Sequence, residues 1–266
     1  MIHSSFTYKN VFQGHDVMVF IPHEDDEINV AGATIYGLRQ EGFRVICVFA
    51  TNGDRSYLAE TRIHEASAAL KMLGVPYEDI IILGYPDGGL DAARSPYAQG
   101  IDHAITVDGH GSTYGIADKA DFSMAKCGKH TPYTRNGFLE DVENLIRKFR
   151  PSNIIAVDLD SHPDHRACSI AFETAIGHIL NDKENTYFPV ALKAFAYNTG
   201  FESVTDFNSL HLYSTRFNRK RLADSSFETD NPVYHYYENI SRLKNGAKSS
   251  PSITFPLKTY ENYVAA

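Results

Sequence analysis

The sequence predicts an α/β protein with a mostly parallel β-sheet in the strand order 3-2-1-4-5 and with helices on both faces. Short apolar runs of strand length alternate with longer segments of helical periodicity, which is typical of βαβ units. Two stretches rich in acidic residues and histidine follow directly after two of these runs, where a parallel sheet forms its ligand-binding crevice. At 266 residues, the chain can form one such domain with a small C-terminal extension.

The first part of the chain contains three predicted strands and two predicted helices. We expect the strands over residues 16–22, 44–50 and 79–83. We expect the helices over residues 29–40 and 58–73. Gly74 favours a helix end directly before it, and the turn residues Asn52, Gly53 and Asp54 favour the end of the second strand.

From residue 84 to residue 137 the alternation of strands and helices lapses. This stretch is rich in glycine and has no sustained periodicity. A long insertion of this kind inside a compact domain is usually either a functional lid or a disordered insert. Regular structure returns with a helix at 138–149, a strand at 153–157, a helix at 165–180 and a strand at 191–197.

The last part of the chain gives weaker signals. Residues 234–237 and 253–257 have the composition of short strands. No internal repeat and no Pro- or Ser-rich linker marks a domain boundary. We therefore expect residues 1–200 to form the α/β domain, with an insertion at 84–137, and residues 201–266 to pack on that domain as an extension.

The composition excludes several classes of protein. A net charge of −8 argues against nucleic acid or an anionic membrane surface as the main partner. The N-terminus has no secretory pattern, and the longest apolar runs are too short to span a bilayer. The odd number and scattered spacing of Cys47, Cys127 and Cys168 indicate buried, free thiols in a reducing compartment. We expect a soluble cytoplasmic protein, and a homo-oligomer stays open.

The two acidic motifs lie far apart in the sequence. Pro22-His23-Glu24-Asp25-Asp26-Glu27 and Asp160-Ser161-His162-Pro163-Asp164-His165 each follow a predicted strand. In the expected strand order, strands one and four are neighbours at the topological switch point, so both motifs reach one crevice. The four consecutive carboxylates repel one another unless a cation lies among them. A divalent metal held by His23, Asp26 and His165 would supply that charge, and three such ligands with an open fourth position are typical of catalytic zinc.

A simpler interpretation exists for the first motif. Asp25 or Asp26 can serve only as the N-terminal cap of the following helix, which is a common use of aspartate. That interpretation leaves the spacing of His162 and His165 in the second motif unexplained. We therefore favour the metal site.

Both motifs resemble the paired motifs of the PIG-L/LmbE-like N-acetylglucosaminyl deacetylase family. The resemblance covers most of the predicted α/β domain. It extends to Thr51-Asn52-Gly53-Asp54, Arg62, Glu65, Leu73-Gly74-Val75 and Pro86-Asp87-Gly88. It implies a Rossmann-like sheet with a zinc site, and an enzyme that hydrolyses the N-acetyl group of an amino sugar.

The resemblance also implies a role for each main residue of the motifs. His23, Asp26 and His165 become ligands of zinc, or of another divalent metal such as Fe²⁺. Asp25 becomes the general base, and His162 assists at the oxyanion or protonates the leaving amine. The chemistry fits these residue types, because bound zinc lowers the pKa of a water molecule and a nearby carboxylate can accept its proton.

Two further residues are implied to contact the substrate. The resemblance places Arg62 near the bound sugar and gives Asp87 a contact with the substrate. Without the resemblance, Arg62 and Glu65 would be read as a surface ion pair at helical spacing. Asp87 would be read as an ordinary turn residue beside glycine.

The sequence departs from the family pattern at two positions. Glu24 stands where the family usually has proline, and its charge is expected to face solvent or the following helix N-terminus. Asp160 stands where some members have tyrosine, so Tyr114 or another loop tyrosine would have to support the oxyanion. Asp164 or Asp160 is expected to hold His162 by a hydrogen bond that favours the charged imidazole.

Other functions compete with a deacetylase. Two histidines and a carboxylate also describe the iron site of non-haem Fe(II) oxygenases, although the additional Asp and His suit hydrolysis better. A non-catalytic sugar-binding protein with a structural metal is a second alternative. A nucleotide-binding protein is disfavoured, because the turn after the first strand has no Gly-x-Gly-x-x-Gly and is acidic.

Overall fold

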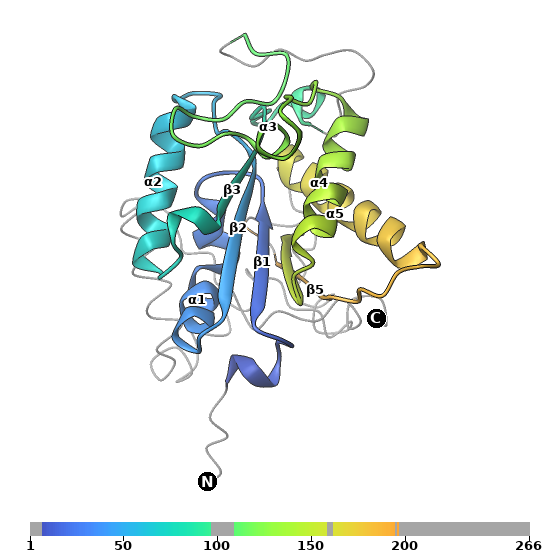
Figure 1. The fold of residues 1–266 in the computed structure, drawn as a ribbon. Helices are drawn as coiled ribbons and strands as arrows, with labels where there is room; N and C mark the ends of the chain where they lie inside the picture. The colour runs from blue at the N-terminus through green and yellow to red at the C-terminus, as the bar shows by residue number, and fades with distance from the viewer. Residues whose placement is uncertain (1–6, 97–108, 159–161, 195, 197–266) are drawn as a thin grey trace, which may run out of the picture.

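The computed structural model describes residues 7–96, 109–158, 162–194 and 196, and this part of the chain contains the predicted sheet (Figure 1). The sheet has five strands in the order β3-β2-β1-β4-β5. All four neighbouring pairs are parallel. The strands are β1 (Asp16–Ile21), β2 (Arg44–Thr51), β3 (Ile80–Tyr85), β4 (Asn153–Val157) and β5 (Val190–Ala194). The predicted fold class and strand order are therefore confirmed.

Helices cover both faces of the sheet. They are α1 (Asp26–Gln40), α2 (Ala59–Met72), α3 (Phe122–Cys127), α4 (Arg135–Phe149) and α5 (Pro163–Asn181). Three short 3₁₀ turns lie at η1 (Tyr8–Asn10), η2 (Tyr77–Asp79) and η3 (Ala92–Arg94). Figure 1 shows α1 and α2 on one side of the strands and α4 and α5 on the other. This division follows from right-handed crossovers, because the chain runs from β1 to β3 in one direction along the sheet and from β3 through β4 to β5 in the other.

The central strands form the core. Almost every residue of β1, β2 and β4 is buried, as expected for a parallel sheet that is covered on both faces. In the register, Phe20 of β1 lies beside Val48 of β2 and Ala156 of β4. The carboxyl ends of β1 and β4 are therefore level, and the two acidic motifs begin side by side.

Three helices begin earlier than expected, and one of them, α4, starts at Arg135 rather than at residue 138. α1 starts at Asp26 rather than near residue 29, so part of the first motif forms its first turn. Acidic residues are favourable there because they face the positive end of the helix dipole. α5 starts at Pro163, which is well suited to the first helical position, and the His162 side chain accepts a hydrogen bond from the Asp164 backbone N–H at 3.2 Å.

The described part of the 84–137 insertion contains more structure than its sequence indicated. α3 lies in this segment, with Asp121 as its N-terminal cap. The backbone N–H of Tyr114 and the hydroxyl of Tyr133 both donate to the carbonyl of Gly84 at the end of β3. Gly84 has a positive φ of 85°, and a Cβ there would lie 2.4 Å from the Tyr114 carbonyl oxygen, so only glycine allows this contact. The insertion thus packs on the carboxyl end of β3.

One further expectation from the sequence was wrong, and others fall on residues outside the described part of the chain. Cys47 and Cys168 are buried free thiols, but Cys127 is exposed, so the expectation of three buried thiols was wrong for this residue. The strands expected at 234–237 and 253–257, and the extension at 201–266, lie outside the described residues. No helix within the described part of the chain is both long and apolar enough to cross a membrane.

Candidate active site

The two motifs meet at the carboxyl ends of β1 and β4. His23 follows β1, while His162 and His165 lie at the start of the helix that follows β4. The ring centroid of His23 is 4.8 Å from that of His162 and 5.4 Å from that of His165. The turn of the first motif is tied to β2, because the Thr51 hydroxyl and backbone N–H both donate to the Pro22 carbonyl. The sheet topology therefore fixes the imidazoles close together.

The three residues expected to bind metal contact one another. Oδ2 of Asp26 lies 3.1 Å from Nδ1 of His23 and 3.2 Å from Nε2 of His165. Burial would raise the pKa of Asp26, but the neighbouring His165 and His23 hold it well below its usual range. Burial would lower the pKa of His23, but hydrogen bonds to Asp164, Asp26 and Asp87 raise it well above its usual value. His23, Asp26 and His165 therefore form a buried group of closely spaced atoms that can bind a metal.

Two overlapping sets of side chains in the described part of the chain have metal-ligand atoms within 4.8 Å of one another. The first set is His23, His162 and His165. The second set is His23, Asp87 and Asp164. Asp26 contacts two imidazoles without belonging to either set, whereas His162 belongs to the first set together with two of the expected ligands.

His162 is held in a defined orientation. Its Nδ1 accepts the Asp164 backbone N–H, so in the neutral ring the proton is on Nε2. Burial and the positive charges of His23 and His165 lower the pKa of His162 to about 4. The sequence interpretation expected a charged imidazole, and the side chain is instead set up as a neutral N–H donor.

Asp164 supports His23 rather than His162. Its Oδ2 lies 3.1 Å from Nε2 of His23 and also accepts the Gly88 backbone N–H at 3.0 Å. The carboxylate thereby joins the second motif to the loop after β3. Asp160, the other expected support, lies outside the described residues.

Asp25 does not act as a helix cap. It occupies the N-cap position of α1, yet its side chain makes no capping hydrogen bond. Its Oδ1 lies 3.6 Å from Nη2 of Arg62, which comes from α2. The simpler interpretation of this aspartate is thus not supported, and Arg62 pairs with the first motif rather than with Glu65 on its own helix.

Glu24 is buried, so the expectation that its charge faces solvent, one of the two alternatives, was wrong. Only 1% of the residue is exposed, and neither carboxyl oxygen has a hydrogen-bond partner in the described part of the chain. Oε2 lies 4.0 Å from Nε of Arg62. Burial raises the pKa of Glu24 to about 8. The side chain packs on Gly53, where a Cβ would lie 2.2 Å from Oε2.

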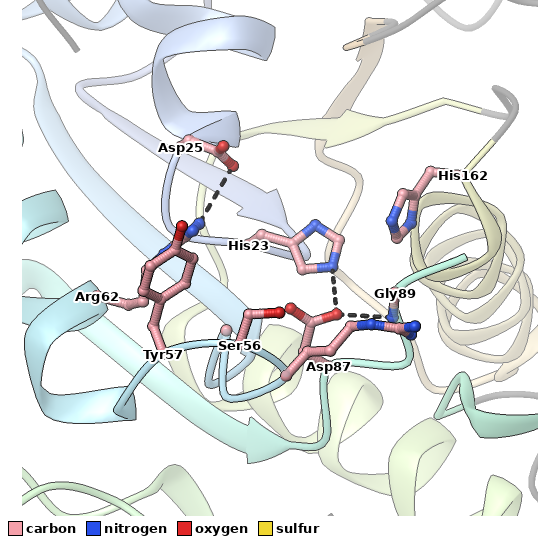
Figure 2. A pocket seen from close by; sticks show the side chains of 10 residues that line it. His23, Asp25, Ser56, Tyr57, Arg62, Asp87, Gly89 and His162 are labelled. Atoms are coloured by element: carbon pink, nitrogen blue, oxygen red, sulfur yellow. Dashed lines mark hydrogen bonds and ion pairs between the residues drawn. The ribbon is translucent and has the colours of Figure 1, made fainter. Parts of the chain in front are cut away.

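A pocket of about 170 Å³ opens beside these residues (Figure 2). Figure 2 shows Asp25 and Arg62 paired at one side, and Asp87 between His23 and Gly89 at the other. The lining residues are His23, Asp25, Gly53, Arg55, Ser56, Tyr57, Arg62, Asp87, Gly89 and His162. The pocket contains both expected catalytic residues and both expected substrate contacts.

Asp87 lies in the loop after β3 and lines the pocket. Its Oδ1 is 3.6 Å from Nε2 of His23 and accepts the Gly89 backbone N–H at 2.7 Å. Burial alone would raise the pKa of Asp87, but the hydrogen bond and charge of His23 lower it to about 2. Asp87 therefore enters the pocket as a carboxylate.

The sequence interpretation missed four lining residues: Arg55, Ser56, Tyr57 and Gly89. The first three lie in the loop after β2, and loops at the carboxyl ends of parallel strands are where ligands bind. Tyr114, the tyrosine considered for the oxyanion, donates its hydroxyl to Asp54 at 2.9 Å and is not among the lining residues. Tyr57 is the lining tyrosine, and 62% of it is exposed.

The chain is similar to one known protein family and to several solved structures. The sequence pattern of the family described as "PIG-L: GlcNAc-PI de-N-acetylase" matches residues 18–176, which include both motifs. The N,N'-diacetylchitobiose deacetylase of Pyrococcus horikoshii is 21% identical, with a TM-score of 0.48 over 96% of this chain and 86% of that chain.

Two other solved structures are similar at a lower level. A conserved protein of Thermus thermophilus is 19% identical, with a TM-score of 0.47 over 92% of this chain and 96% of that chain. The 4-carboxy-2-hydroxymuconate hydratase of Pseudomonas putida is 14% identical, with a TM-score of 0.43 over the same shares, 92% and 96%. Likeness at this level does not identify an activity.

Proposed function

The chain belongs to the PIG-L family of GlcNAc-PI de-N-acetylases, and on this premise we propose that it is a metal-dependent amidohydrolase. Its proposed substrate is an N-acetylglucosamine-type amino sugar or a conjugate of one. The single observation that carries the proposal is the placement of a carboxylate, Asp25, at a pocket next to the buried group of His23, Asp26 and His165.

The residues present suit a divalent metal. Imidazole nitrogen and carboxylate oxygen are the donors that zinc takes in catalytic sites. Oδ1 of Asp26 is buried and has no hydrogen-bond partner in the described part of the chain, as expected of an oxygen that awaits a cation. We assign His23, Asp26 and His165 as ligands, with zinc as the metal and Fe²⁺ as the alternative. When bound, the metal would polarise the amide carbonyl and lower the pKa of a water molecule.

Side chains of the pocket are assigned the proton transfer and the stabilisation of the oxyanion. Asp25 lines the pocket and accepts a proton from the attacking water as the water oxygen adds to the carbonyl carbon of the acetamido group. The C–N bond then breaks, so that acetate and a free amine leave, and the amine nitrogen takes up the proton. His162 offers an Nε2–H donor, which suits the carbonyl oxygen as it gains negative charge.

The substrate contacts are assigned to the two sides of the pocket. Asp87 is a carboxylate acceptor for sugar hydroxyls. Arg62, held by Asp25 and Glu24, offers its remaining N–H donors to the sugar. The exposed ring of Tyr57 gives a flat apolar face on which a sugar ring can pack.

A screen of N-acylated amino sugars for acetate release tests the proposal. Metal-loaded protein should release acetate and free amine in equal amounts, and protein treated with a chelator should not. Equal turnover without oxygen would separate hydrolysis from an Fe(II)-dependent oxygenation. Sugar binding without acetate release from any acylated substrate would instead identify a sugar-binding protein.

A further inference from the structure

Arg55 stands apart from the other charged residues of the pocket. It lies in the loop after β2 and is exposed, yet its guanidinium makes a hydrogen bond to the backbone. Nη1 donates to the carbonyl of Gly88 at 2.5 Å. This contact anchors the side chain against the loop that follows β3, so the guanidinium lines the pocket.

The pocket is built to receive this guanidinium. Gly89 has a φ of 57°, and a Cβ at this position would lie 2.1 Å from Nη1 and 2.5 Å from Cζ of Arg55. A side chain at residue 89 would therefore displace the guanidinium. Because residue 89 has no side chain and the Gly88 carbonyl accepts a hydrogen bond, the guanidinium of Arg55 is positioned in the pocket.

Ion pairs of other arginines are present in the described part of the chain, but Arg55 has no acidic partner within 4.0 Å there. By contrast, Arg62 in the same pocket forms an ion pair with Asp25 at 3.6 Å. One of the five N–H donors of Arg55 is used by a carbonyl, and four are left for a ligand or for water.

The nearby carboxylates are already engaged by other donors. Oδ1 of Asp54 accepts the Asp87 backbone N–H, and its Oδ2 accepts the Tyr114 hydroxyl. Oδ1 of Asp87 accepts the Gly89 backbone N–H and lies 3.6 Å from Nε2 of His23. None of these contacts involves Arg55, and no carboxylate in the described part of the chain lies within 4.0 Å of its guanidinium nitrogens.

We propose that Arg55 binds an anionic group of the substrate, a carboxylate or a phosphate, on the part of the amino-sugar conjugate that lies at the pocket mouth. The inference rests on the proposed deacetylase function and specifies its substrate class. A guanidinium presents paired N–H donors that match the oxygens of either anion. In a chain with a net charge of −8, a fixed cation at the mouth also offsets the repulsion that an anionic substrate would meet.

Three substrates that differ in one group test the proposal: methyl N-acetylglucosaminide, N-acetylglucosamine 1-phosphate and the carboxymethyl glycoside of N-acetylglucosamine. The native enzyme should prefer at least one anionic substrate in kcat/KM. Arg55→Gln should lower kcat/KM for that substrate by about 10- to 100-fold, the usual loss of a charge-assisted hydrogen bond, and change the neutral one by less than about 2-fold. The phosphate and carboxylate arms identify which anion is recognised.

Two matched variants and the ionic strength complete the design. Arg55→Lys keeps the charge without the fork and should recover part of the preference. Arg147→Gln removes an arginine that pairs with Glu143 on α4, outside the pocket, and should change none of the three values. Added salt should weaken the preference of the native enzyme and leave Arg55→Gln unchanged.

A binding measurement separates this inference from the proposed function. Calorimetric titration with N-acetylglucosamine 1-phosphate and with the carboxymethyl glycoside needs no turnover. An affinity that falls in Arg55→Gln would support the anion site even if no acetate were released, in which case only the deacetylase proposal fails. Equal losses for neutral and anionic substrates, or no effect of Arg55→Gln on either binding or turnover, would overturn the inference.

Discussion

Oδ1 of Asp25 lies 3.6 Å from Nη2 of Arg62, so the proposed general base faces a guanidinium from the second helix instead of capping the first. Asp26, the next residue, is fully buried and turns toward His23 and His165. Neighbouring aspartates at a helix start thus point to different partners. This divergence allows two carboxylates adjacent in sequence to perform two different functions.

Replacement of each aspartate by asparagine should separate these functions. Asp25→Asn removes a proton acceptor and keeps the ligands, so metal should stay bound while kcat falls by about 10²- to 10⁴-fold, the usual contribution of a general base. Asp26→Asn weakens a ligand, so metal affinity itself should fall. Metal content and kcat, measured on the same preparations, check both. Loss of metal in Asp25→Asn with retention in Asp26→Asn would mean that the roles are exchanged.

Removal of the metal should abolish turnover and leave the sheet folded. The ligands lie in the turn and helix starts that follow β1 and β4, and the buried side chains that stabilise these strands are apolar. His23→Ala and His165→Ala should each lose metal stoichiometry, with an unchanged far-ultraviolet circular dichroism spectrum. His178→Ala is the matched control, because this imidazole lies on the surface of α5 and pairs with Glu143. Full metal occupancy in both ligand variants would rule out the assignment.

His162→Ala distinguishes a hydrogen-bond donor from a ligand. If His162 donates Nε2–H to the developing oxyanion, metal should stay bound and kcat should fall by about 10²- to 10³-fold, with a smaller change in KM. If its nitrogen binds the metal, as its closeness to His23 and His165 also allows, the variant should lose metal. Elemental analysis before kinetic measurement decides between the two.

The contact between Gly53 and Glu24 should appear as a coupling in stability. Gly53→Ala combines a left-handed backbone, at φ 58°, with a clash against Oε2 of Glu24. The backbone contribution is about 1–2 kcal/mol and the overpacking about 1–3 kcal/mol. In the Glu24→Ala background only the backbone contribution should persist, so the cost of Gly53→Ala should shrink. Denaturant unfolding of all four proteins gives the coupling, and strictly additive values would contradict the contact.

The sheet was predictable because its signals are local and repeated. Apolar runs of strand length give β1, β2 and β4, and the handedness of crossovers then limits the strand order. The meeting of His23 with His165 follows from that order alone. By contrast, the start of α1 at Asp26 depends on which acidic side chains are buried, and a pattern of residue types does not contain this information.

Other features of the site depend on contacts between distant loops. Glu24 is buried because Gly53, in the loop after β2, leaves room for it. Arg55 reaches the pocket because Gly88 and Gly89 receive its guanidinium. Neither the glycine nor the charged residue signals the pairing by itself. Asp164 was expected beside His162, and its carboxylate lies against His23 because the loop after β3 supplies the Gly88 N–H that positions it.

The adjacency of β1 and β4 has a consequence for how the enzyme matures. β2, α2, β3 and α4 all lie between these strands along the chain. A nascent chain that ends before β4 therefore carries an acid-rich turn without His162 or His165. Pairing of such distant segments comes late, because closing a long loop costs entropy before the contacts form. An ion held by both motifs would be retained only by molecules that have completed the sheet, so metal occupancy in newly synthesised protein would report successful folding.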